Sequence, residues 1–278
     1  MKKTLYAAGL ALMLAGVFIS CKKAPADDVN PNALTQDEKG LVAAAGFNSN
    51  WAERTADGNY LIEGDVVVTK AQLTEMAGAT PSNFIIVGNE EHYRTYNVVN
   101  TGGGVRTITI SLGSGFPAYY STALDNALAR YNSYGLTINF QRVASGGEIS
   151  ITGANLGTSG GGCILGQASG FPDASGNPSP GFTLSTSSCA TTYLNTVDKA
   201  DEVMAHEIGH CIGFRHTDYK KRASCGPGPG ESAGTIGAVW IPGTPTNVSG
   251  SYNSWMMACT NGSPLFNGDD GIALQYVY

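Results

Sequence analysis

Hydrophobic and polar positions in the central part of the chain follow the periods of strands and of a helix. Residues 106–112 alternate and are rich in β-branched side chains, which predicts a strand. Apolar side chains three or four apart in residues 121–132 predict a helix. Residues 136–143 and 148–152 predict two further strands, the second flanked by glycines. The order strand, helix, strand predicts a parallel pair with a right-handed crossover.

Residues 34–93, which precede this region, contain short predicted elements of their own. Residues 35–38 (TQDE) resemble a helix start, residues 60–69 read as extended, and residues 71–76 predict a short helix or turn. A piece of this size holds little core alone, so we expect it to pack against the larger domain. Its position predicts a pro-segment over residues 34–93, followed by a catalytic domain over residues 94–278.

The remaining stretches are poor in periodic apolar residues. Residues 153–196 and 226–250 are rich in small, polar or helix-breaking residues and predict long surface loops. Near the end, Asn267 can cap a last helix over residues 271–277. We expect three of its side chains to be partly buried: Ile272, Leu274 and Tyr276.

The N-terminus carries an export pattern. Lys2 and Lys3 precede an apolar run that ends before Ser20 and Cys21, and residues 18–21 resemble a bacterial lipobox. This pattern predicts a lipoprotein signal peptide over residues 1–20, a lipid anchor on Cys21 and a flexible tether over residues 21–33. The expected location is therefore the bacterial cell envelope. The alternative is an ordinary secretory signal and a secreted protein.

Composition narrows the class of protein. Removing residues 1–20 takes away two lysines and no acidic residue, which changes the formal net charge from −6 to −8. An acidic exported chain is not expected to bind nucleic acid. Only 14% of residues are charged and 37 are glycine, which is typical of a loop-rich globular enzyme. We expect a monomer.

Three of the four histidines lie in residues 206–216, which read HEIGHCIGFRH. A helix over residues 199–212, capped by Asp198, would place His206 and His210 about 40° apart around its axis. Both imidazoles can then bind one metal ion from the same face. The alternative is a solvated polar stripe on a helix.

A third histidine completes the pattern. Gly213 can take the positive φ that ends a helix, so that the chain returns His216 to the same ion. Three imidazoles with one open position indicate a catalytic zinc site and not a closed structural one. Glu207 lies on the same side and can take the proton of a zinc-activated water.

These residues match HExxHxxGxxH, the metzincin signature, and the chain resembles the bacterial dual-action HEIGH metallopeptidases. Residues 254–256 (SWM) resemble the methionine turn below the zinc, with Met256 as the methionine and Met257 as the adjacent alternative. Ala258 stands where several metzincin groups carry a tyrosine ligand, so no tyrosine switch is expected.

The resemblance implies an α+β fold: a metzincin-like zincin catalytic domain with a mixed sheet, two main helices and a C-terminal lower subdomain. It implies zinc endopeptidase activity on proteins or peptides. In metzincins an edge strand at the upper rim of the cleft binds extended substrate, and residues 148–152 are the candidate here. The alternative is a lipid-anchored adhesion protein without turnover, against which the intact Glu207 and three histidines argue.

A second resemblance concerns latency. Residues 62–65 (IEGD) resemble the Phe-x-Gly-Asp element by which astacin pro-segments place an aspartate on the catalytic zinc. Asp65 would then occupy the position of the catalytic water, and Gly64 would let the backbone approach the cleft. The alternative is a Gly-Asp turn at the end of a strand.

Two further acidic residues have candidate roles. Asp218 can orient a ligand histidine or, equally well, bond to the backbone of the methionine turn or to an arginine. Asp173 and nearby carbonyls can bind calcium, although no EF-hand spacing supports this ion. One catalytic zinc is the cofactor that we expect.

Five cysteines follow Cys21, and an exported protein is expected to pair them. Cys163 with Cys189 would close one loop. The other three compete for one bond, and we favour a pair between Cys211 and Cys225 that would tie the zinc helix to the following loop.

Overall fold

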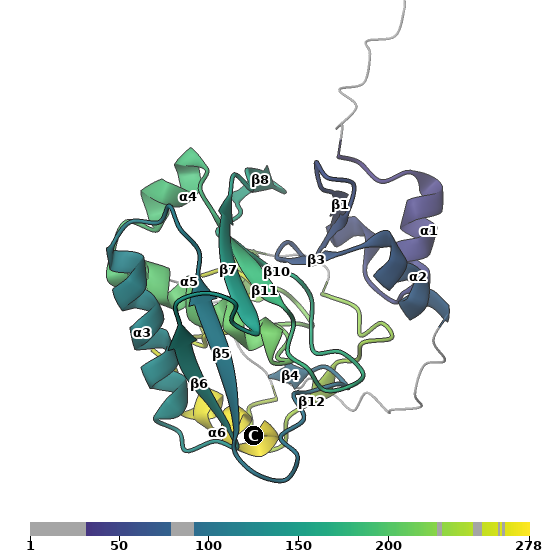
Figure 1. The fold of residues 1–278 in the computed structure, drawn as a ribbon. Coiled ribbons are helices and arrows are strands. Elements are labelled where there is room, and N and C mark those ends of the chain that lie inside the picture. Colours follow the sequence, from purple (N-terminus) through teal and green to yellow (C-terminus); the bar gives the residue numbers. More distant parts are fainter. Residues whose placement is uncertain (1–31, 79–91, 227–229, 247–251, 261, 263–264) are drawn as a thin grey trace, which may run out of the picture. The chain divides into compact units, whose positions relative to one another are not determined.

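The computed structural model describes residues 32–78, 92–226, 230–246, 252–260, 262 and 265–278 (Figure 1). The predicted signal peptide, Cys21 and most of the tether lie outside the described residues. Within those residues, no helix has both the length and the apolar character needed to cross a bilayer.

Five of the six described α-helices lie near positions where the sequence predicts a helix, whereas the helix at residues 188–193 lies within a stretch that was expected to be a surface loop. The capping box that Thr35 forms with Glu38 opens the first of them, as its sequence predicts. The α-helices are α1 (Gln36–Ala44), α2 (Lys70–Gly78), α3 (Tyr119–Asn132), α4 (Ser188–Tyr193), α5 (Val197–Cys211) and α6 (Gly268–Val277), and the 3-10 helices are η1 (Ser49–Trp51) and η2 (Ala223–Cys225).

A mixed sheet forms the centre of the fold, and its order in the described residues is β1-β2-β3-β10-β11-β7-β5-β6. The pairs β3–β10, β11–β7, β7–β5 and β5–β6 are parallel and the others antiparallel. Its strands are β1 (Ala52–Arg54), β2 (Tyr60–Ile62), β3 (Val66–Val68), β5 (Arg106–Leu112), β6 (Ile138–Val143), β7 (Ile149–Ala154), β10 (Gly166–Ala168) and β11 (Gly181–Ser185). Two-residue strands form two small separate sheets: β4 (Tyr93–Arg94) with β12 (Val239–Trp240), and β8 (Thr158–Ser159) with β9 (Gly162–Cys163).

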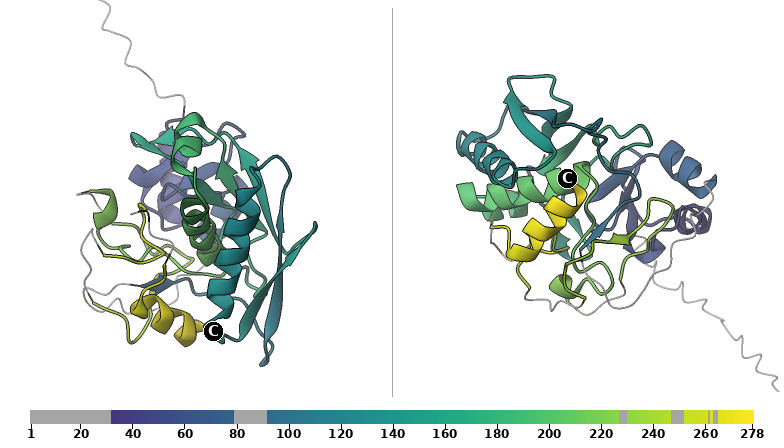
Figure 2. Two further views of the ribbon diagram at one scale, coloured as in Figure 1. Left: turned by 90° about the vertical axis from the view of Figure 1, so that its left-hand side faces the viewer. Right: turned by 90° about the horizontal axis from the view of Figure 1, so that it is seen from below.

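The predicted parallel pair is confirmed. Strands β5 and β6 run parallel and are joined by α3, which lies with α5 on one face of the sheet (Figure 2). Leu124, Ala127 and Leu128 of α3 are buried in the main core with Ile108 and Ile110 of β5. This packing fixes α5, and therefore the zinc motif, against the sheet.

The segment before residue 79 has its own small core and also extends the sheet. Val42, Phe47, Tyr60, Ile62 and Leu73 belong to a buried cluster separate from the main core. Strand β3 pairs with β10 through Ala168 and Val66, so β1, β2 and β3 continue the central sheet. The expectation that this piece packs against the larger domain is confirmed.

Two expectations about the region after β6 are wrong. Residues 153–196 are not only surface loops, because they contain two strands, β10 and β11, inside the central sheet. Their small and polar residues hide the strand pattern, although four of the five residues of β11 are buried. The strand predicted at residues 148–152 is not at the edge either, since β7 lies between β11 and β5.

Both C-terminal helices differ in detail from the expectation. The N-cap of α5 is Thr196, whose hydroxyl accepts the backbone N–H of Lys199, and not Asp198. In α6, Leu274 is buried, but Ile272 and Tyr276 are 42% and 55% exposed. The residue that anchors α6 instead is Asp270, a buried carboxylate that accepts the backbone N–H of Asn267 and of Trp255.

Candidate metal centre

Helix α5 brings two histidines of the motif onto one side, as the spacing predicts. The Nε2 atoms of His206 and His210 lie 3.1 Å apart. Gly213 has φ +107° and ends the helix, after which the chain brings His216 beside them. One side-chain ligand atom from each of His206, His210, His216 and Asp65 lies within 4.8 Å of every other.

Backbone and carboxylate acceptors orient the three imidazoles. The Nδ1 atom of His206 lies 2.8 Å from the carbonyl oxygen of Trp255, and that of His210 lies 2.9 Å from the carbonyl oxygen of Phe214. Because a carbonyl oxygen can only accept, both Nδ1 atoms carry the proton. In the neutral form of each imidazole the Nε2 atom then carries the lone pair that can bind a metal ion.

This arrangement fits a zinc ion. Two lone pairs 3.1 Å apart repel each other unless a cation lies between them. Imidazoles bound to zinc at about 2.0–2.1 Å in a tetrahedral arrangement have nitrogen atoms about 3.3–3.4 Å apart. The donor set of three imidazoles and one carboxylate is also one that zinc prefers.

A tight turn between β2 and β3 places Asp65 at the centre. Glu63 and Gly64 both have positive φ, +58° and +91°. The Oδ2 atom of Asp65 lies 2.5 Å from Nε2 of His216 and 3.5 Å from Nε2 of both His206 and His210. The carboxylate thus takes a fourth position about the point where the three imidazoles converge.

Glu207 is buried beside this centre. Its Oε2 atom has no hydrogen-bond partner among the described residues. Burial, and then the negative charge of Asp65, raises the pKa of the Glu207 carboxyl well above its usual range. A side chain at Gly166 would overlap this carboxylate, so glycine lets β10 pass directly next to it.

The methionine turn lies under the motif. Met256 is 1% exposed, and a Cβ atom at Gly209 would overlap its sulfur, which gives the glycine of the HEIGH sequence a packing role. The turn is joined to the third histidine's segment, since the backbone N–H of Thr217 donates to the carbonyl oxygen of Met256 at 2.6 Å. The same segment carries the Thr217 hydroxyl, which lies 2.7 Å from that of Ser254.

Asp218 does not orient a ligand histidine in this structure. Its carboxylate accepts the backbone N–H of Ala258 at 2.9 Å and both the N–H and the hydroxyl of Ser224. The alternative of a bond to the backbone at the methionine turn is therefore what the structure shows. This bond holds the chain just after the turn.

Glu231 orients the third histidine, and sequence reasoning missed it. Its Oε1 lies 2.5 Å from Nδ1 of His216 and 2.6 Å from a guanidinium nitrogen of Arg222. Although burial opposes ionisation, His216, Arg222 and Arg215 keep the pKa of Glu231 at about 2. The residue lies 15 positions after His216 in a loop without a motif, so no local signal pointed to it.

We expect Glu231→Gln to weaken zinc binding about 10–100-fold, because the carboxylate that orients His216 is replaced by a neutral amide. Competition with a chromophoric chelator measures the zinc Kd. Glu148→Gln is the matched control, since Glu148 pairs with Arg106 on the surface. An unchanged Kd for Glu231→Gln would show that Glu231 does not support the site.

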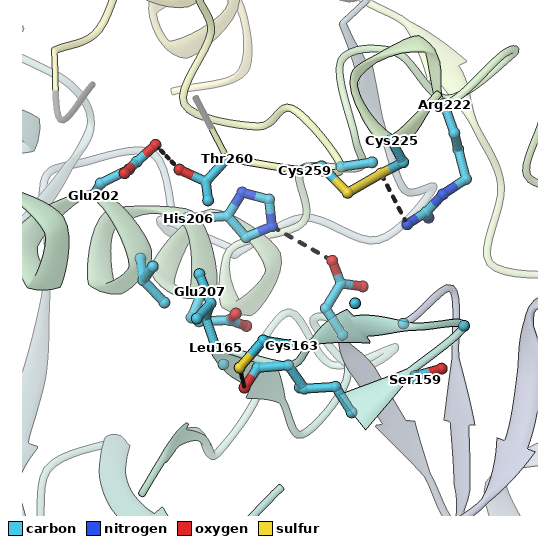
Figure 3. A pocket seen from close by; sticks show the side chains of 18 of the residues that line it. Ser159, Cys163, Leu165, Glu202, His206, Glu207, Arg222, Cys225, Cys259 and Thr260 are labelled. Atoms are coloured by element: carbon cyan, nitrogen blue, oxygen red, sulfur yellow. Dashed lines mark hydrogen bonds and ion pairs between the residues drawn. A yellow bond between two sulfur atoms is a disulfide. The ribbon is translucent and has the colours of Figure 1, made fainter. Parts of the chain in front are cut away.

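A cavity of about 530 Å³ opens beside the centre (Figure 3). Both disulfides of the described residues border it.

The predicted disulfide Cys163–Cys189 is confirmed, with Cα atoms 6.0 Å apart. The expected Cys211–Cys225 pair is wrong, because α5 buries Cys211 in the core as a free thiol, while Cys225 bonds to Cys259 just after the methionine turn.

The chain is similar to several solved structures at low sequence identity. One structure of myroilysin matches with 22% sequence identity over 43% of this chain and 54% of that chain, with a TM-score of 0.29. A second structure of myroilysin matches with 18% sequence identity over 71% of this chain and 96% of that chain, with a TM-score of 0.34. High choriolytic enzyme 1, a hatching enzyme zinc-protease from the medaka fish Oryzias latipes, matches with 16% over 44% and 50% (TM-score 0.26). The chain thus spans about half the length of two of these three neighbours. No curated protein sequence matches the chain.

One family model matches most of the chain, namely residues 60–278, and its description is dual-action HEIGH metallo-peptidase. The matched range includes Asp65, Glu207 and the three histidines of the centre. The chain therefore belongs to the dual-action HEIGH metallopeptidase family.

Proposed function

We propose that this metallopeptidase is a zinc-dependent endopeptidase in which His206, His210 and His216 hold the metal and Glu207 is the general base. The observation that carries the proposal is the convergence of three Nε2 atoms beside a buried carboxylate. Family membership supports the reaction class, because a metallopeptidase hydrolyses peptide bonds with the help of a metal ion.

The buried carboxylate supplies the proton transfers. Zinc, when bound here, provides a Lewis acid that polarises a carbonyl and lowers the pKa of a water molecule. The Oε2 atom of Glu207 has no partner in the part of the chain that the structure describes, and burial raises the pKa of the carboxyl, which suits a group that accepts a proton from the attacking water. It then returns the proton to the leaving amine.

We propose further that residues 34–93 form a pro-segment that keeps the enzyme latent through Asp65. The Asp65 carboxylate excludes water from the fourth position, since its Oδ2 atom is within 3.5 Å of all three Nε2 atoms. A buried ion pair and a hydrogen bond hold the turn in place: the Glu63 carboxylate pairs with Arg215, and the backbone carbonyl oxygen of Glu63 accepts a hydrogen bond from Arg222 at 2.7 Å. Removal of the pro-segment would leave a catalytic domain over residues 94–278.

Strand β10 is the edge to which we assign the substrate. In the full chain its edge is covered by β3, and the Ala168 N–H donates to the carbonyl oxygen of Asp65 at 2.7 Å. When β3 leaves, the same backbone groups can pair with an extended peptide. This assignment replaces the one made for residues 148–152, whose strand is internal.

We also propose that the protein is exported and anchored by a lipid on Cys21, with residues 1–20 removed. The support is the sequence pattern alone. Mass spectrometry of the mature N-terminus tests it, since a diacylglyceryl cysteine at position 21 is expected and an unmodified N-terminus contradicts it.

Removal of zinc should abolish peptide hydrolysis. We expect dialysis of the Asp65→Ala chain against a chelator to lower kcat/KM at least about 100-fold, because the Lewis acid is lost. One equivalent of zinc should restore activity, whereas calcium should not. Activity that survives complete zinc removal, or that calcium restores, would contradict the proposed function.

A further inference from the structure

The cavity beside the metal centre has charged groups at two ends. Glu202 and Arg222 both line it, and Figure 3 shows them on opposite sides of His206. Glu202 lies one helical turn before His206 on α5, so it faces the same cleft. The two ends differ in how their charges are neutralised.

The Arg222 end is already paired. One guanidinium nitrogen of Arg222 binds Glu231 at 2.6 Å and the carbonyl oxygen of Glu63 at 2.7 Å. Departure of the pro-segment would remove Glu63 but leave Glu231. Arg222 therefore keeps a carboxylate partner when substrate binds.

The Glu202 end has no cationic partner in the described part of the chain. Among the described residues its carboxylate accepts neutral donors: the hydroxyl of Thr260, the N–H of Gly262 at 3.1 Å and the hydroxyl of Tyr193 at 3.2 Å. No salt bridge between described residues involves Glu202, and the ammonium of Lys199 lies over the Tyr193 ring instead.

Glu202 is buried in a cavity with apolar walls. Glu202 is 6% exposed, and Val203, Trp255 and Ala258 add apolar surface to the lining of the same cavity. A carboxylate in such surroundings interacts strongly with a cation that displaces water from the cavity. A long side chain with an apolar stem and a cationic end matches both features.

We propose that Glu202 is a specificity-determining residue that selects substrates with lysine or arginine next to the scissile bond. The substrate's alkyl stem would lie along Val203 and Trp255, and its cation would pair with the Glu202 carboxylate. This inference rests on the proposed endopeptidase function, whose substrate class it names.

The test is a pair of fluorogenic peptides that differ only by lysine or norleucine at the residues flanking the cleaved bond. In the Asp65→Ala chain we expect kcat/KM to be at least about tenfold higher for the lysine peptide. In the Asp65→Ala/Glu202→Gln chain this ratio should fall to about one, because the lysine peptide loses the carboxylate that pairs with its cation.

Thr260→Val tests whether the lysine preference comes from the charge of Glu202 or from the hydrogen bond by which Glu202 holds the loop at Thr260. This change removes the Thr260 hydroxyl bond but leaves the Glu202 carboxylate, so the lysine preference should persist. Equal rates for both peptides, or a lysine preference that survives Glu202→Gln, would overturn the inference while leaving the endopeptidase function intact. Absence of any cleavage would overturn that function, and the inference with it.

Discussion

Glu207→Gln is expected to abolish peptide hydrolysis while one zinc ion per chain stays bound. Loss of a general base lowers kcat by about 10²–10⁴-fold, and here the same group serves both proton transfers, so we expect the upper end of that range. Zinc stays because the converging ligand atoms belong to other residues. Fluorogenic peptide hydrolysis and the zinc content, both measured in the Asp65→Ala background, give the two readouts.

Stability distinguishes this loss from misfolding. The Glu207 carboxylate is buried with one oxygen atom unpartnered among the described residues, and a neutral amide is cheaper to bury. The melting temperature of Glu207→Gln should therefore equal or exceed that of its parent. Hydrolysis within tenfold of the parent would reject Glu207 as the general base.

Asp65→Ala is expected to activate the full-length chain. Alanine removes the Oδ2 atom that contacts all three imidazoles, which opens the fourth position to water. Because β3 still covers β10, the gain should be largest for short peptides and smaller for folded proteins. We expect kcat/KM for a short fluorogenic peptide to rise at least about tenfold over the wild-type chain.

Asp57→Ala is the matched control for this activation. Asp57 belongs to the same proposed pro-segment, but it is exposed, and its side-chain bonds within the described residues are to Thr55 and Asn59. Its substitution should leave the wild-type rate unchanged. If Asp65→Ala were as inactive as the wild-type chain, Asp65 would not be the latency ligand.

The parts of the site that could be predicted from the sequence are those whose geometry depends on neighbouring residues in the chain. His206, Glu207 and His210 share one helical turn, and a single glycine returns His216, so the four residues depend on one helix and its end. Helix periodicity alone then specifies their relative positions. Asp65 is different, because no local rule brings a residue 141 positions before His206 to the same point; it was found through a short resemblance.

The parts that sequence missed depend on contacts between distant segments. Glu231 reaches His216 from a loop with no periodic pattern, and Arg215 and Arg222 pair with Glu63 from the other end of the chain. Strand β10 reads Gly-Gln-Ala, which has no β-branched residue, and it is a strand because β3 and β11 flank it.

The pairing of the cysteines also depends on contacts between distant segments. The pair favoured from the sequence was Cys211 with Cys225, which would tie the zinc helix to the following loop. The helix geometry of α5 turns Cys211 into the core, where its thiol lies 3.5 Å from the carbonyl oxygen of Gly181. The methionine turn instead brings Cys259 beside Cys225, with Cα atoms 5.2 Å apart.

Zinc K-edge X-ray absorption of the full-length wild-type chain tests the central claim most directly. The account predicts one zinc per chain surrounded by three imidazole nitrogens and one carboxylate oxygen, all at about 2.0–2.2 Å. In Asp65→Ala the three imidazoles should remain. A sulfur shell at about 2.3 Å, or fewer than three imidazoles, would contradict it.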